Sequence, residues 1–227
     1  MTATRVDISA WTASFRYPNL ISGVQPTLEV PPMSTVLGLL NAAAGRYLQH
    51  ENLQIGYYFE FGAKAEDVET TYQITSDGKG NPSNVAKSNI MRREFLFDVR
   101  LSLYLTDERL IDAVKQPVFP LLLGRSGDLA TIERIEPIEL QEVTNASKIK
   151  GQIVPLAGNF LPGKLQALPR YFTDTFPRQN LGTEPFSIIR FDIPGENPSK
   201  LTAWRDWGQG KGGVDIFFHQ FNLAEHA

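Results

Sequence analysis

The sequence of 227 residues predicts an α+β fold, and three observations support it. Apolar residues alternate with polar ones at a period of two in residues 5–15 and 93–105, as in strands with one buried face. An apolar stripe with helical spacing follows the first of these segments. A long polar segment, residues 63–92, comes before the second. We therefore expect a ferredoxin-like order of strand, helix, strand, strand, helix and strand, with a protruding arm in the middle.

The first three elements are expected between residues 5 and 48. Residues 5–15 form the first strand. Residues 16–30 are rich in Asn, Gly and Pro, which predicts a loop. Ser34 or Thr35 can then cap a helix that runs to about Leu48, because both hydroxyls can accept a hydrogen bond from a free backbone amide.

The next two strands flank the polar segment. Residues 54–62 are enriched in aromatic and β-branched side chains, which favours a strand, and residues 93–105 alternate strictly. Long connectors without structure of their own are uncommon in compact domains. We therefore expect residues 63–92 to form a thumb-like flexible hairpin, whose base strands include residues 70–74.

Asp107 is expected to cap a second helix over residues 108–116, and residues 135–143 form the fourth strand. Beyond residue 144 the content of Pro and Gly rises. We predict a ferredoxin-like domain over residues 1–146 and a small β-rich C-terminal appendage over residues 147–227. Its expected strands are 152–156, 186–193 and 214–221.

Composition excludes several classes of protein. The chain has no cysteine, so disulfide scaffolds and cysteine-based zinc sites are excluded. It carries no phosphate-binding loop motif, no basic leader followed by an apolar run, and no apolar segment long enough to span a membrane. The three histidines, His50, His219 and His226, lack metal-ligand spacing. We expect a cytoplasmic protein without a cofactor or metal, and its net charge of −3 restricts any nucleic-acid contact to a local basic surface.

Two groups of basic residues suggest such a surface. Lys87, Arg92 and Arg93 lie along the predicted arm, where flexible cations could follow a phosphate backbone. Charges that protect an edge strand from aggregation would explain them equally well. Arg16 beside Tyr17 offers a cation and a stacking plane of the kind that holds single-stranded bases. The alternative is a core tyrosine next to a surface arginine.

Two further segments could approach a ligand through their backbone. At Gly124, Arg125 and Ser126, glycine allows backbone amides to come close to a phosphate, and the arginine adds charge. An ordinary tight turn would also account for the glycine. The helix start at Ser34 and Thr35 offers free amides and a favourable dipole, although capping alone would explain both hydroxyls.

Three segments together resemble a known family. They are FRYPNLISGVQPTLEVPPMSTVLGLLNAAAG (residues 15–45), MRREFLFDVRLSLYL (residues 91–105) and FPLLLGRSGDLATI (residues 119–132). They resemble the Cas-five family of CRISPR-associated RAMP proteins, and the similarity is closest to the type I-B variety. The resemblance implies a RAMP fold with a thumb hairpin and a role as the foot subunit of a Cascade surveillance complex. It also implies a prokaryotic source.

The resemblance further implies partners and contact residues. The chain would hold the 5′ handle of the CRISPR RNA, contact a Cas-seven-type backbone subunit and a Cas-eight-type large subunit, and meet target DNA indirectly. It would have no membrane partner. The thumb would enter the junction between handle and spacer. The implied RNA contacts are Arg16, Gly23, Gln25, Ser34, Thr35, Lys87, Arg92, Arg93, Gly124, Arg125 and Ser126.

Two alternative functions remain open. Some members of this family cut precursor RNA by metal-independent acid/base chemistry, which needs a base, an acid and a cation around one phosphate. Only His50 lies within the matching region, at the far end of the first helix, so a non-catalytic subunit is favoured. The second alternative is an interaction module unrelated to RNA. The tryptophan- and glycine-rich residues 204–215 could pack the appendage or form an interface.

Overall fold

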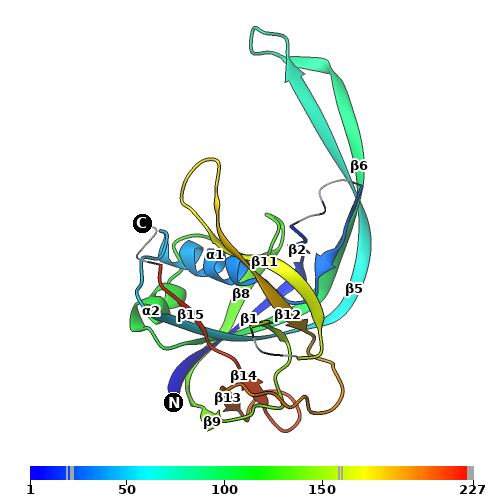
Figure 1. The fold of residues 1–227 in the computed structure, drawn as a ribbon. Helices are drawn as coiled ribbons and strands as arrows, with labels where there is room; N and C mark the ends of the chain where they lie inside the picture. Colours follow the sequence, from blue (N-terminus) through cyan, green and yellow to red (C-terminus); the bar gives the residue numbers. More distant parts are fainter. Residues whose placement is uncertain (19, 21–22, 158, 160, 224–227) are drawn as a thin grey trace.

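The computed structural model describes residues 1–18, 20, 23–157, 159 and 161–223, with residues 83–86 described as backbone only. The body is mostly β-sheet, and its largest sheet is curled (Figure 1). Its strand order is β15-β5-β6-β1-β8-β7, with the short strand β3 added beside β6. The bounds of these strands are β1 Thr2–Ala13, β3 Val24–Gln25, β5 Leu53–Ser76, β6 Pro82–Leu105, β7 Leu121–Leu122, β8 Leu129–Glu139 and β15 His219–Phe221.

The helices α1 (Met33–Ala44) and α2 (Glu108–Lys115) cover one face of this sheet and share its main hydrophobic core. Asp107 caps α2 as expected, because its side chain accepts a hydrogen bond from the Arg109 amide. The expected cap of α1 is wrong. Its N-cap is Pro32, without a side-chain hydrogen bond, and the helix ends at Gly45 in the left-handed conformation, before Leu48. Proline fixes an extended backbone that enters the helix without a hydroxyl cap.

The arm is a regular continuation of the sheet. β5 and β6 pair antiparallel in one register from Ile55 opposite Leu105 to Ile74 opposite Ala86, so the ladder runs from the core into the arm, and the register shifts only before Ser76 opposite Pro82 (Figure 1). The hairpin is confirmed, but two details of the prediction are wrong. Residues 63–76 and 82–92 are strand rather than irregular connector, and residues 70–74 lie toward the tip rather than at the base. The tip is closed by Asp77, whose carboxylate accepts the amide hydrogens of Lys79 and Asn81.

The rest of the chain builds small sheets around the body. Two of them have the orders β10-β12-β11 and β14-β13-β9, and β2 pairs with β4. The expected strand 135–143 is divided, because β8 begins at Leu129 and β9 joins another sheet. The expected strand 214–221 is also divided, into β14 and β15, and β11 and β13 were not predicted. The bounds are β2 Phe15–Arg16, β4 Thr27–Leu28, β9 Gln141–Val143, β10 Gln152–Pro155, β11 Lys164–Phe172, β12 Asn180–Ile189, β13 Ala203–Asp206 and β14 Val214–Ile216.

The C-terminal strands pack on both faces of the large sheet. β10, β11 and β12 contribute to the core on the helix side, while β14 packs with Tyr58 and Tyr104 on the opposite face. On the helix side, Tyr57 of β5 links the sheet to the start of α1 and to β10. Its hydroxyl donates to the Pro31 carbonyl and accepts from the Ile153 amide. β15 adds directly to β5. The division at residue 146 stays a prediction.

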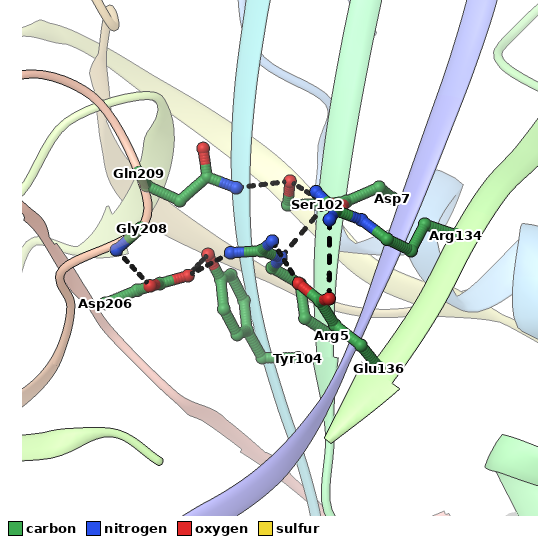
Figure 2. A network of polar contacts seen from close by, with 9 residues as sticks. All are labelled: Arg5, Asp7, Ser102, Tyr104, Arg134, Glu136, Asp206, Gly208 and Gln209. Carbon is green, nitrogen blue, oxygen red and sulfur yellow. Dashed lines mark hydrogen bonds and ion pairs between the residues drawn. The ribbon is translucent and has the colours of Figure 1, made fainter. Parts of the chain in front are cut away.

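A polar network fastens the segment after β13 to the face opposite the helices (Figure 2). The largely buried guanidinium of Arg5 pairs with Asp206 (Nη1 to Oδ2, 3.0 Å) and with Glu136. The Tyr104 hydroxyl donates to the same Asp206 oxygen at 2.9 Å. Gln209 reaches Ser102 at 2.8 Å. Because buried charges are stable only when they are paired and hydrogen-bonded, this network fixes where the C-terminal chain crosses the sheet.

His219 in β15 makes stability depend on pH. Its ring is fully buried among Tyr57, Phe217 and Phe221, and Nε2 lies 3.1 Å from the Ile153 carbonyl. Burial lowers its pKa to about 4. The unfolded chain, whose histidine titrates near pH 6.5, binds the proton more readily, so this contribution is present above about pH 6.5 and is lost as pH falls toward 4.

We expect this group to remove roughly 2 kcal/mol of unfolding free energy between pH 7.5 and pH 5. Urea unfolding at both pH values checks this value, with His219→Gln as the comparison, because glutamine keeps a donor and does not titrate. The difference in stability between the two proteins should shrink by that amount at pH 5. Equal pH dependence in the two proteins would contradict the assignment.

Candidate nucleic-acid interface at the base of the arm

Strand β3 brings the first loop to the base of the arm. It pairs parallel with β6, with Val24 opposite Arg92 and Gln25 opposite Arg93. The Arg92 amide donates to the Gly23 carbonyl at 3.0 Å, and Gly23 itself has a φ of +79°, which glycine adopts without strain. Four predicted positions from two distant parts of the sequence therefore meet at one stretch of β6: Gly23, Gln25, Arg92 and Arg93.

Arg16 reaches the same region through β2 and β4. It lies opposite Thr27, whose amide donates to Glu94 of β6 at 3.1 Å. The Ser14 hydroxyl donates to the Glu94 carbonyl at 3.0 Å, which holds the end of β1 against the arm. Arg16 is exposed, while Tyr17 is half-buried and packs against the core. The arginine can therefore reach a ligand, and Tyr17 offers only part of its ring.

The loop at Gly124 lies against the same strands. Gly124 has a φ of +114°, and a Cβ there would lie 2.1 Å from the Ser14 carbonyl oxygen. Arg125 lies over the ring of Phe95 in β6, with 5.8 Å from Cζ to the ring centroid. Its Nε and Nη2 also donate to the buried carboxylate of Asp128 at 3.1 and 3.0 Å. Ser126 is exposed beside them.

The cations at the arm base are paired with carboxylates of differing exposure. Arg92 Nε lies 3.1 Å from Glu66, and both side chains are largely in solvent. Arg93 Nη2 lies 2.7 Å from Glu69, with only 12% of the arginine side chain exposed. The hydrogen bond to Asp128 raises the pKa of Arg125 and holds it in place. Exposed ion pairs are worth little, so Arg92 can exchange Glu66 for a phosphate at small cost. Arg125 would have to give up its hydrogen bonds to the buried Asp128 carboxylate, and its contact with RNA stays a prediction.

Three predicted contacts lie apart from the arm base. Lys87 is opposite Gln73, farther along the arm, and its side chain is exposed. Ser34 lines a small hollow with Tyr171 and Arg178, next to β11. The Thr35 amide donates to the Pro32 carbonyl at 2.9 Å inside the first turn. The helix start therefore faces the C-terminal sheet, and any contact of Ser34 or Thr35 with RNA stays a prediction.

The arm has one apolar and one polar face, a feature that our reading of the sequence missed. Residues directly opposite each other in the ladder share a face, as do alternate residues along a strand. The apolar face exposes Val68, Tyr72, Ile74 and Ile90, each at 60–65%. Thr70, Ser88 and Arg92 lie on the same face, with Arg92 at its base opposite Val68. The other face carries polar and charged side chains: Asp67, Glu69, Thr71, Gln73, Lys87, Asn89 and Arg93. The period of two in residues 68–74 is the signal that could have predicted it.

The described residues offer no acid/base pair at the arm base. His50 lies beside α2, where its Nε2 is 3.7 Å from the Asp107 carboxylate. His219 is buried in the body. Burial and the neighbouring Arg109 lower the pKa of His50. His226 lies outside the described residues. Among those described, no group of three or more His, Asp or Glu side chains could hold a metal ion.

Comparison with known proteins agrees with this geometry. The family model of the CRISPR-associated protein Cas5 matches residues 5–172. The chain belongs to the Cas5 family. The match begins at Arg5 in β1 and ends at Phe172, the last residue of β11. It contains α1, the complete arm and the Gly124 loop of this Cas5 protein. No curated protein matches the chain.

Solved structures share the fold. A chain of a CRISPR RNA-guided surveillance complex superposes with a TM-score of 0.54 and 16% identity, over 86% of this chain and 91% of that one. A chain of the type III-B Cmr-β complex bound to cognate target RNA and AMPPnP superposes with a TM-score of 0.59 and 9% identity. A chain of the same complex bound to cognate target RNA gives a TM-score of 0.52 and 12% identity. Each match covers 86% of both chains. The described part of this Cas5 protein has no helix of the length and apolar character that a membrane crossing needs.

The close approach at Gly124 predicts a large effect of a small substitution. Gly124→Ala would force its Cβ into the Ser14 backbone at an unfavourable φ, so we expect a loss of roughly 3 kcal/mol in unfolding free energy. Gly127→Ala is the matched control, because a Cβ there meets nothing within 4 Å. Urea unfolding of both variants measures the effect. Equal stabilities would show that the loop does not need this contact.

Proposed function

We propose that this Cas5 protein is a non-catalytic CRISPR RNA-binding subunit of a type I surveillance complex, of the I-B variety, which holds the 5′ handle of the RNA. The observation that carries the proposal is the convergence of Arg16, the β3 loop and Arg92 at the arm base, within a chain of the Cas5 family. Cas-seven-type and Cas-eight-type subunits are the proposed protein partners. The large sheet supports a ferredoxin-like core, since it contains the order β8-β1-β6-β5 with both helices on one face.

The two faces of the arm suit different partners. Lys87 and the exposed polar groups around it can lie along a phosphate backbone, because flexible cations neutralise phosphates without reading sequence. The apolar face, with Tyr72 and Ile74, is costly to leave in water on an isolated ribbon. We propose that a neighbouring subunit covers the part of this face around Tyr72 and Ile74, beyond Arg92, while the arm enters the junction between handle and spacer.

The RNA site can be tested through two exposed cations. Arg92→Ala with Lys87→Ala should weaken binding of a synthetic handle RNA at least about tenfold near 0.1 M salt. The slope of log affinity against log salt should fall by about 1.4, because each lost contact with a single strand removes about 0.7. Fluorescence anisotropy at several salt concentrations measures both quantities.

The matched control removes the same charge from another surface. Arg109 and Lys115 of α2 are exposed to a similar degree, and each is paired with a carboxylate, as Arg92 is. Arg109→Ala with Lys115→Ala should leave the salt slope at the wild-type value. A handle affinity that is unchanged in the arm variant, or reduced equally in both variants, would show that the arm base does not hold RNA.

The absence of an acid/base pair at the arm base leads us to propose that the protein does not cut RNA. Repeat RNA incubated with the purified protein in EDTA should stay intact, as judged by denaturing gel electrophoresis. A product with a defined end, abolished by His50→Ala, would instead establish a metal-independent endoribonuclease.

A further inference from the structure

The sheet face opposite the helices is only half covered. The segment after β13 crosses the half that carries Arg5 and Tyr104, and the polar network holds it there (Figure 2). The other half, toward the arm, carries side chains from β5, β6, β1 and β8. It forms part of a hollow of about 740 Å³ that continues to Gly208 and Gln209.

An exposed apolar row crosses this uncovered half. Trp11 of β1 is 80% exposed and lies beside Phe97 of β6, with 6.0 Å between ring centroids. Leu129 of β8, 62% exposed, lines the same hollow as Trp11. Tryptophan is enriched at the energetic centres of protein interfaces, because its large ring becomes buried against a partner. Three large apolar side chains side by side in water indicate that something covers this row.

The charges around the row favour a cationic partner. The hollow carries four carboxylates, Asp7, Glu60, Asp98 and Glu133, and three guanidinium groups, Arg5, Arg100 and Arg134. Arg5 pairs with Asp206 and Glu136, which lie outside the lining, so the four carboxylates face Arg100 and Arg134 alone. An excess of carboxylates repels phosphate and attracts lysine or arginine. This face is thus unsuited to the RNA proposed for the arm base.

We propose that the uncovered half of this face docks a segment of a protein subunit, with an apolar side chain against Trp11 and Leu129 and lysine or arginine side chains facing Glu60, Asp98 and Glu133. The proposal rests on the proposed function, which supplies a multisubunit complex. It adds a protein interface separate from the arm. The occupant is an extended or looped segment, because the hollow is bounded by the chain's own Gly208 and Gln209 on one side.

Photo-cross-linking tests the occupant directly. The protein is co-expressed with the subunits encoded beside it and with its RNA, with a benzoylphenylalanine in place of Trp11. Mass spectrometry should find a cross-link to a lysine- or arginine-bearing peptide of another subunit. Trp207 is a second exposed tryptophan and lies outside the hollow. Benzoylphenylalanine at this position is the control, and it should not cross-link to the same peptide. A cross-link to RNA, or no cross-link, would overturn the proposal.

Substitutions separate this surface from the RNA site. Trp11→Ala with Asp98→Lys should reduce retention of the cross-linked subunit at least about tenfold at 0.3 M salt, while RNA per chain stays at the wild-type level. Trp207→Ala should retain both. Wild-type retention in the first variant would overturn the docking surface. If the wild-type complex purifies without RNA, the proposed function is refuted. A cross-link from position 11 to another protein subunit would still support the docking surface in that case.

Discussion

The long ladder between β5 and β6, which keeps one register from the core to Ile74, is the constraint on which the rest of the structure depends. A two-stranded ribbon is marginally stable in water, so the arm needs an anchor. The same strands supply it, because Tyr57, Phe59, Leu101 and Leu103 lie fully buried between the helices and the rest of the sheet. The register set in the core therefore continues into the arm and decides which side chains share each of its faces.

A local kink in β6 marks the transition from body to arm. Ala10 pairs with Val99 and Thr12 with Phe97 in one register, and Asp98, between Phe97 and Val99, has a φ of +50°. Leu96 and Val99 are both buried although they are three residues apart. The kink at Asp98 thus changes which face of β6 its side chains occupy, and Phe97 lies exposed beside Trp11, immediately before the arm begins.

The charges of the molecule are divided between surfaces. The overall charge is −3, yet Arg16, Lys87 and Arg92 are exposed at the arm and its base, with Lys87 and Arg92 on opposite faces of the arm. Carboxylates collect on the face opposite the helices, around Glu60 and Glu133. Since interactions between exposed charges are screened within about 10 Å at moderate salt, the two surfaces can act independently. A protein that is slightly acidic overall can therefore offer one site for a polyanion and another for a basic segment.

The sequence by itself determined the strands with one buried face, the cap of α2 by Asp107 and the family, because each depends on local periodicity or on a short motif. Only the tertiary structure decided the rest. The arm was expected as a flexible hairpin with strands that include residues 70–74, and its full strand length was not predicted, because both of its faces are in water and no burial pattern marks the strands. The pairing of β3 with β6 and the contact of Arg5 with Asp206 join segments that are far apart in the chain, so they depend on chain folding rather than on local sequence. Long-range strand pairing brings these residues together, and it leaves no local signature in the sequence.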